Sequence, residues 1–348
     1  MWVGFGMWIR WSGGRGPATG LPADLQQHHS GNHCRAEGTH SSAAFVLESP
    51  VRLLGTRRGS SRPLSIPTTM PRRLLADEIA LPESEMNLAR AALLVAKEEY
   101  PQLSVELYLA RLDQLAEEVK DRLANETAPL VILDELVATL FVRRKLTGNR
   151  KAYYDPRNSF LNDVLDRGLG IPLTLGIVIL EVGWRLGLPL EGVGFPNHFL
   201  VRYKGDALDL LIDPFDSGKV RFEDEAQELL DRAYGGAVRL RDSFMRRADR
   251  RDLLVRLLAN LKGVYLNKGD HRRALAAVER ILLVIPMAPA ENRSRGVLLA
   301  RLGRHDEAVE QLEDYLQASR GAADAPRIGK MLRDLREGIT PPEGLEGL

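Results

Sequence analysis

The sequence predicts an α+β core that is preceded by helices and followed by an all-α region. Amphipathic helical patterns fill residues 74–146, and short apolar strands follow one long apolar helix between residues 171 and 215. The last third of the chain repeats itself at a spacing of 34 residues, as from Gly269 to Gly303. A helix leading into antiparallel strands is typical of α+β proteins, and a repeat of this length indicates paired, stacked helices.

Composition limits the classes of function. The chain has 348 residues, enough for two domains at roughly 100 to 200 residues each. Its 48 basic and 47 acidic residues give a net charge of +1, so we expect no direct nucleic-acid binding. A single cysteine, Cys34, favours a reducing compartment, by default the cytoplasm. The apolar run at residues 171–184 contains Glu181 and is shorter than the roughly 20 residues a bilayer requires, so no membrane span is expected.

Residues 1–72 differ in composition from the rest of the chain. Before Met70 they contain no lysine, seven arginines and three acidic residues, and they lack a periodic apolar pattern, so we expect a disordered extension. The histidine-rich stretch at residues 28–40 lacks the spacing of a metal site, and no metal or cofactor is expected. Either a transit peptide or a start codon upstream of the true one near Met70 explains the segment.

The core elements follow in order. Three amphipathic helices are predicted at residues 87–100, 105–123 and 129–146. Asn158 or Ser159 is expected to cap a short helix that ends at residues 168–170, and Pro172 to open a long helix that closes at Gly187. Strands are then predicted, separated by turns at residues 196–197 and 204–205; they span residues 190–195, 198–203 and 208–215.

The C-terminal third reads as two helical repeats. Ala274 aligns with Ala308, and Val278 with Leu312, at the same spacing of 34. Because two such units leave apolar faces without neighbours, they are expected to dock on the central domain. The charged run at residues 246–252 is expected to be a solvated interdomain face. The predicted division is a core at 73–240, tetratricopeptide-like repeats at 241–338 and a flexible tail at 339–348.

Three motifs resemble those of the bacterial SirB-type family. They are YYDPRNSFLNDVLDRGLGIPLTL, GLPLEGVGFPNHFLVRY and LLIDPF, in that order and followed by the repeats. The resemblance covers roughly residues 74–338. It implies a papain-like, transglutaminase-like core followed by tetratricopeptide repeats, and a link to gene regulation without a settled biochemical activity.

The resemblance also implies positions for a catalytic triad. Active transglutaminase-like enzymes place a cysteine at the start of the core helix and a histidine and an aspartate on neighbouring strands. His198 and Asp213 match the last two positions, whereas the cysteine position falls on or beside Pro172, where no cysteine occurs. Thr174 lies roughly 200° further round the helix.

Six residues are therefore candidate cleft residues, with structural and functional interpretations both open. His198 and Asp213 either satisfy each other's hydrogen bonds and hold a ligand, or take part in chemistry. Thr174 is either a substitute nucleophile or a hydroxyl bonded to the backbone, and Cys34 is a remote alternative nucleophile. The Asp155–Asn158 run is either a turn with a cap or part of the same groove. The candidates are His198, Asp213, Thr174, Pro172, Asn158 and Asp155.

The missing cysteine favours a non-catalytic or cryptic transglutaminase-like protein. We expect it to bind a protein or peptide through its repeats and cleft, with no nucleic-acid or membrane partner. The alternative is a hydrolase or acyltransferase that acts on amide bonds through His198 and Asp213 with an unidentified nucleophile. An oxygen or sulfur nucleophile beside the His198 ring would distinguish the two.

Overall fold

The computed structural model describes residues 69–339 except 207–208 and 223–224. Apart from Ile339, the expected tail at 339–348 lies outside the described residues, as do the histidine-rich stretch and Cys34. Helix α1 (Met70–Ala80) begins within the extension predicted to reach residue 72. Arg72 is only 7% exposed and bonds Glu98 at 2.9 Å. The folded part therefore includes residues 70–72, and the described residues cluster as one compact unit.

The three helices predicted before residue 147 are confirmed. They are α2 (Leu88–Glu99), α3 (Val105–Leu123) and α4 (Pro129–Val137), which continues as the π-helical turn η1 (Ala138–Arg143). Asn87 caps α2 by accepting a hydrogen bond from the Arg90 N–H at 2.8 Å, as short polar residues commonly do. Helix α2 is buried along most of its length, so it is a central core helix.

The short helix of the core begins differently from the prediction. Helix α5 (Leu161–Arg167) follows Phe160, which makes no side-chain cap bond, and Asn158 and Ser159 lie in the preceding 3-10 helix η2 (Pro156–Ser159). The predicted capping by Asn158 or Ser159 is therefore wrong, because Phe160 occupies the N-cap position of α5 and both predicted caps lie before it, in η2. The end of α5 is as predicted: Gly168 adopts φ 67°, a left-handed conformation that suits glycine.

Helix α6 (Pro172–Arg185) begins at Pro172, as predicted, and its residues are buried as far as Gly183. A proline is well placed in the first turn of a helix because its missing N–H is not needed there. A small parallel pair not anticipated from the sequence, β1 (Thr147–Gly148) with β2 (Leu169–Gly170), lies just before α6.

An antiparallel five-stranded sheet follows α6. Strands β3 (Leu190–Val193), β4 (Leu200–Lys204) and β5 (Asp209–Asp213) were predicted, whereas β6 (Lys219–Phe222) and β7 (Arg247–Ala248) were not. The strand order is β6-β5-β4-β3-β7. Strand β7 pairs with β3 although it follows residue 240, so the sheet extends past the predicted end of the core domain.

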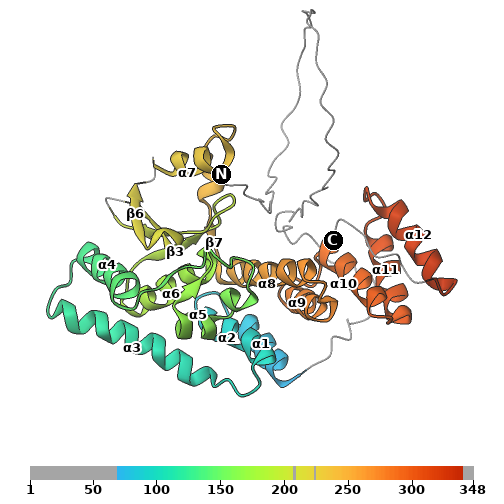
Figure 1. Ribbon diagram of the computed structural model, residues 1–348, viewed down its shortest axis with the longest axis horizontal. Helices are drawn as coiled ribbons and strands as arrows, with labels where there is room; N and C mark the ends of the chain where they lie inside the picture. Colours follow the sequence, from blue (N-terminus) through green and yellow to red (C-terminus); the bar gives the residue numbers. More distant parts are fainter. Residues whose placement is uncertain (1–68, 207–208, 223–224, 340–348) are drawn as a thin grey trace, which may run out of the picture. The chain divides into compact units, whose positions relative to one another are not determined.

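Helices cover both faces of this sheet (Figure 1). Helix α7 (Ala226–Tyr234) closes a cluster with Val193, Leu200 and Leu211 on one face. Helix α6 packs against β3 and β4. A Cβ atom at Gly176 would lie 2.2 Å from the Phe199 ring and 3.4 Å from Pro214. The missing side chain at Gly176 therefore lets α6 approach both the segment after His198 and the segment after Asp213.

The C-terminal repeats are confirmed as helix pairs. The helices are α8 (Arg250–Asn267), α9 (His271–Val284), α10 (Pro289–Arg301), α11 (His305–Ala318) and α12 (Ala325–Arg336). Gly269 and Gly303 occupy equivalent turns with φ 69° and 72°. The spacing of 34 thus repeats the same left-handed turn between paired helices.

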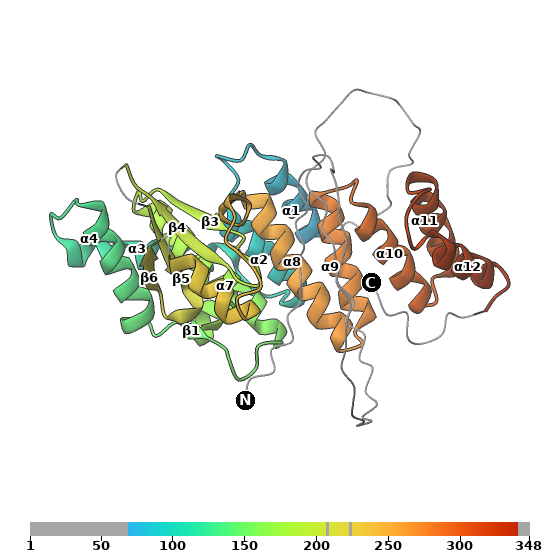
Figure 2. The ribbon, with the colours of Figure 1, turned by 90° about the horizontal axis from the view of Figure 1, so that it is seen from above.

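Helices α8 and α9 of the first repeat contact α2 and α1, respectively, within the same compact unit (Figure 2). Arg72 of α1 bonds Glu279 of α9 at 2.6 Å, and both residues are buried. Arg250 donates to the carbonyls of Glu83 and Met86, and Arg251 to that of Ile79. The expectation that residues 246–252 form a solvated face is therefore wrong for these two arginines, whose donors bind backbone carbonyls at the end of α1 and in the loop after it.

Candidate active-site remnant

His198 and Asp213 lie together on the wall of a cleft of about 300 Å³. His198 belongs to the turn before β4, and Asp213 is the last residue of β5, which pairs with β4. The Nε2 atom of His198 lies 2.8 Å from Oδ1 of Asp213. The strand pairing therefore produces the contact expected from the two motifs, and it does so between residues 15 positions apart.

Asp213 is held as a carboxylate. It is 4% exposed, and its Oδ1 also accepts from the N–H groups of Phe215 at 3.0 Å and Asp216 at 3.1 Å. Burial alone would raise the pKa of Asp213, but the hydrogen bond and charge of His198, with the two backbone donors, outweigh it and lower that pKa. An ionised Asp213 accepts the Nε2 proton of His198 and leaves Nδ1 as the second ring nitrogen.

The turn that carries His198 is fixed from both sides. The His198 N–H donates to the Phe195 carbonyl at 3.0 Å, and Asn197 adopts φ 56°. The His198 carbonyl accepts from Arg256 of helix α8. Burial among these groups lowers the pKa of Arg256 to about 10, although the nearby Tyr153 opposes that shift. The first repeat helix thus contributes directly to the position of the histidine turn.

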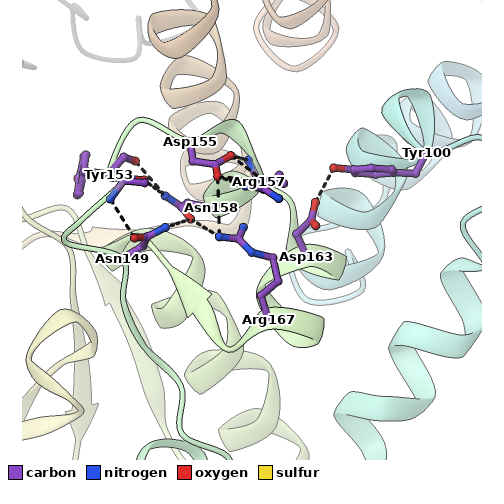
Figure 3. A network of polar contacts seen from close by, with 9 residues as sticks. Tyr100, Asn149, Tyr153, Asp155, Arg157, Asn158, Asp163 and Arg167 are labelled. Atoms are coloured by element: carbon purple, nitrogen blue, oxygen red, sulfur yellow. Dashed lines mark hydrogen bonds and ion pairs between the residues drawn. The ribbon is translucent and has the colours of Figure 1, made fainter.

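Asn158 organises a separate polar network (Figure 3), and its carbonyl is bonded to Thr174 of helix α6. It is fully buried, and its Nδ2 donates to the carbonyls of Ala152 at 2.7 Å and Tyr153 at 3.1 Å. Its Oδ1 accepts from Asn149 at 3.0 Å and Arg167 at 3.4 Å. All polar atoms of the Asn158 side chain are therefore used within the protein, which supports the structural interpretation of this residue.

Asp155 acts as a cap in the same network. Its Oδ1 accepts from the Arg157 N–H at 3.0 Å at the start of η2, and its carboxylate pairs with the Arg157 guanidinium at 2.7 Å. The hydrogen bond from Arg157 lowers the pKa of Asp155. The Asp155–Asn158 run thus forms the turn and cap that its composition indicates, with Asp155 and not Asn158 as the capping residue.

Thr174 also serves the backbone. Its Oγ1 donates to the Asn158 carbonyl at 2.7 Å and accepts from the Ile171 N–H at 3.2 Å, and the residue is 1% exposed. Pro172 is buried in the first turn of α6. Neither residue lines the cleft, and neither do Asp155 or Asn158. Of the six candidates, the structure brings only His198 and Asp213 together at the cleft.

Two cleft residues, and a tyrosine that packs against the cleft residue Phe215, were not anticipated from the sequence. Arg150 lies over the Phe215 ring at 4.6 Å and donates to the Phe215 carbonyl at 2.9 Å, and Arg232 of α7 also lines the cleft. Tyr153 extends this aromatic contact, with its ring 5.9 Å from that of Phe215. The sequence motifs contained Tyr153 and Phe215, in the YY pair and in LLIDPF. They gave no indication of Arg150 and Arg232, because an arginine on a loop and one on a helix follow no recognisable spacing.

The cleft lining lacks the side chains that act as triad nucleophiles. Within the described part of the chain, no serine, threonine, cysteine or lysine lines this cleft. The described residues also contain no group of three or more histidine, cysteine, aspartate or glutamate side chains arranged to hold a metal ion. Among those residues, no helix is both long and apolar enough to cross a membrane.

Comparisons with known proteins agree with this architecture. Residues 106–259 match the transglutaminase-like superfamily, and residues 261–333 match a tetratricopeptide repeat family. A UPF0162 protein of Xylella fastidiosa is 38% identical over 242 residues, which are 68% of this chain and 85% of that relative. The chain belongs to the UPF0162 family. A Vibrio cholerae UPF0162 protein is 28% identical over 234 residues, 67% of this chain and 86% of its own length.

This UPF0162 chain also shares a shorter region with a eukaryotic protein. F-box only protein 21 of Mus musculus is 37% identical over 107 residues, which are 28% of this chain and 17% of that protein. No solved structure matches the chain significantly. The combination of a transglutaminase-like domain with tetratricopeptide repeats indicates a protein-interaction module.

Proposed function

We propose that this UPF0162 protein is a non-catalytic, regulatory module that binds a protein or peptide partner in the His198 cleft and on its repeats. The observation that carries the proposal is the cleft wall, which keeps His198 and Asp213 but offers no nucleophilic side chain among the described residues. Loss of the nucleophile alone costs a triad enzyme roughly 10^6 in turnover, as subtilisin shows. A cleft of this composition is better suited to holding a ligand.

The rim of the cleft has the composition of a binding surface. Tyr153 and Tyr154 are 42% and 45% exposed, and their rings pack edge to face at 5.4 Å. Arg150 and Phe215 continue the same surface. Exposed tyrosines and arginines are enriched among the residues that dominate interface energies, so this rim supports the proposed contact with a peptide.

The repeats contribute in two ways. Helix α8 is buried along most of its length, so its role is to join the repeats to the core and, through Arg256, to fix the His198 turn. Helices α10 to α12 follow it in the stack and carry the remaining repeat surface for a partner. A cytoplasmic location is part of this proposal and rests on the single cysteine, Cys34.

A second candidate function is hydrolysis or acyl transfer at an amide bond. The intact His198–Asp213 contact favours it, because Nδ1 of His198 makes no hydrogen bond with any described residue and could accept a proton. A nucleophile from outside the cleft lining would be needed. Amide hydrolysis by the unmodified protein that is abolished in His198→Ala would establish this function and overturn the non-catalytic one.

Peptide display tests the binding proposal. A random peptide library is selected against the full chain, and the selected peptides are measured on Ala233→Trp, which fills the cleft, and on Ala318→Trp, which adds the same bulk to an exposed position of α11. We expect peptides whose binding is lost in the first variant and kept in the second. If every selected peptide binds both variants equally, the cleft is not a peptide site.

A further inference from the structure

We propose that the cleft recognises a carboxylate of its peptide ligand through Arg150 and Arg232. This inference rests on the proposed peptide-binding function and names the chemical group that the cleft selects. It follows from the way charge is distributed on the cleft wall: the acidic side chains are already paired within the protein, whereas the two guanidinium groups are not.

The two carboxylates on the wall have internal partners. Asp213 is engaged by His198 and by two backbone N–H groups. Asp216 pairs with Arg221 at 3.0 Å, and that arginine side chain is 2% exposed. Among the described residues, neither acid forms an ion pair with Arg150 or Arg232, and Asp216, 47% exposed, directs its Oδ2 to Arg221 instead.

Arg150 and Arg232 face the same cleft without acidic partners. Among the described residues, no carboxylate lies within ion-pair distance of either guanidinium, whereas the cleft acids Asp213 and Asp216 pair with His198 at 2.8 Å and with Arg221 at 3.0 Å. Arg150 binds the Phe215 carbonyl and Arg232 the Glu228 carbonyl, at 2.9 and 3.3 Å. Each guanidinium is thus bonded on one side to a neutral carbonyl, and its charge remains uncompensated.

Arg150 is held in place before any ligand binds. Its guanidinium lies 4.6 Å from the centroid of the Phe215 ring, and its Nη2 is bonded to the backbone of the same residue. Stacking on an aromatic ring fixes the plane of the fork, which lowers the entropic cost of binding an anion. The donors not used by the Phe215 carbonyl match the planar geometry of a carboxylate.

The neighbouring surface indicates a peptide as the source of this carboxylate. Phe215 and Leu229 line the cleft together with the two arginines, and the exposed Tyr153 ring lies 5.9 Å from that of Phe215. A peptide segment supplies an apolar side chain for this surface together with an acidic side chain or its C-terminal carboxylate. Both sources present the same group, and the probes below separate them.

The experiment titrates the full chain with three small probes while the His198 ring is observed by NMR. N-acetyl-aspartate methylamide carries a side-chain carboxylate, N-acetyl-glycine a terminal one, and N-acetyl-asparagine methylamide is the neutral isostere. The His198 resonance is assigned from its absence in His198→Asn. We expect a saturable shift with at least one acidic probe and none with the amide, the responding probe identifying the source.

Matched variants connect the shift to the two arginines. Arg150→Gln/Arg232→Gln removes both donors, whereas Arg272→Gln/Arg320→Gln removes the same charge from exposed positions on and after the repeat helices. Because charge-assisted hydrogen bonds are lost, we expect the affinity for the acidic probe to fall by about tenfold or more in the first variant and to stay unchanged in the second. Equal shifts with acid and amide, no saturable shift with any probe, or equal loss in both variants would overturn the inference.

Failure of this inference is distinguishable from failure of the peptide-binding function. Peptides from the display experiment that are blocked by Ala233→Trp, lack an acidic group and bind Arg150→Gln/Arg232→Gln normally would refute carboxylate recognition and leave the cleft as a peptide site. The absence of any peptide sensitive to Ala233→Trp would refute both.

Discussion

Asp213 shows how one side chain connects the strand, the turn and the cleft. Its Oδ1 lies within hydrogen-bond distance of Nε2 of His198, in the turn before β4. The same oxygen accepts hydrogen bonds from the N–H groups of Phe215 and Asp216 in η3 (Pro214–Asp216). The carboxylate therefore caps a turn and orients an imidazole at the same time. These contacts stabilise the charged form of Asp213, which makes the folded state sensitive to its protonation.

Replacing Asp213 with asparagine is expected to destabilise the protein by about 1–3 kcal/mol at neutral pH, since buried donors lose a charged acceptor. The folded-state pKa of Asp213 is lowered, so its contribution is present above the unfolded pKa of about 3.9 and is lost as pH falls through the folded pKa. Urea unfolding should show the gap between wild type and Asp213→Asn narrowing as pH falls below about 4. A gap that does not change with pH would contradict the assignment.

Gly176 illustrates, at the scale of the element, why α6 can reach the two motif strands. Glycine normally weakens a helix interior by roughly 1 kcal/mol relative to alanine. Here its small size is required, because an added Cβ would clash with Phe199 at 2.2 Å. The packing requirement outweighs the helix propensity at this position.

Gly176→Ala is therefore expected to lower the free energy of unfolding by about 1–3 kcal/mol, the usual range for overpacking. Gly329→Ala in α12 is the matched control, because its Cβ would meet only the end of the Arg333 side chain at 3.8 Å. That control should be neutral or stabilise by up to about 1 kcal/mol. Chemical denaturation of both variants measures the difference, and stabilisation by Gly176→Ala would show that the helix and Phe199 are less tightly packed.

Buried charge joins the repeats to the core at the scale of the whole folded unit. Arg72 bonds Glu98 and Glu279, and Arg280 of α9 bonds Glu98 of α2. Burial alone would raise the pKa of Glu98, but Arg280 and Arg72 lower it. These ions compensate one another, so removing Arg72 leaves the carboxylates of Glu98 and Glu279 with only Arg280 and Arg295, among the described residues, to balance their charge.

Arg72→Met is expected to destabilise the protein by about 3–5 kcal/mol, the range for breaking a buried ion pair. The exposed pair Arg144–Glu118 at 2.6 Å gives the control, and Arg144→Met should cost less than about 1 kcal/mol. Unfolding in urea compares the two. Similar small losses in both variants would mean that the buried ions do not hold the repeats against the core.

The junction between sheet and repeats is expected to resist limited proteolysis. It contains several arginines, which trypsin would cleave in a flexible linker, but Arg250 is bonded to carbonyls of the loop after α1 and Arg251 to the Ile79 carbonyl near the end of α1. Trypsin should therefore cut residues 242–252 no faster than the folded core. Rapid cutting there into two stable fragments would contradict a docked arrangement of the repeats.

Local sequence patterns determined most of the elements of this protein. The helices at 88–123, the start of α6 at Pro172, the end of α5 at Gly168 and the glycine turns of the repeats all depend on interactions within a few residues. The contact between His198 and Asp213 was also predictable, because two short neighbouring strands join them. The missing cysteine is a property of the sequence itself.

The tertiary structure decided which side chains share the cleft and which are used internally. Asn158 and Thr174 bond backbone groups from separate elements, so no spacing rule could separate their structural role from a catalytic one. Arg150 and Arg232 come from a loop and a helix far apart in sequence, and β7 and Arg256 belong to the approach to the repeats yet complete the core. Periodicity reports a residue's own element, whereas a cleft depends on which elements pack together, and that is set by long-range packing.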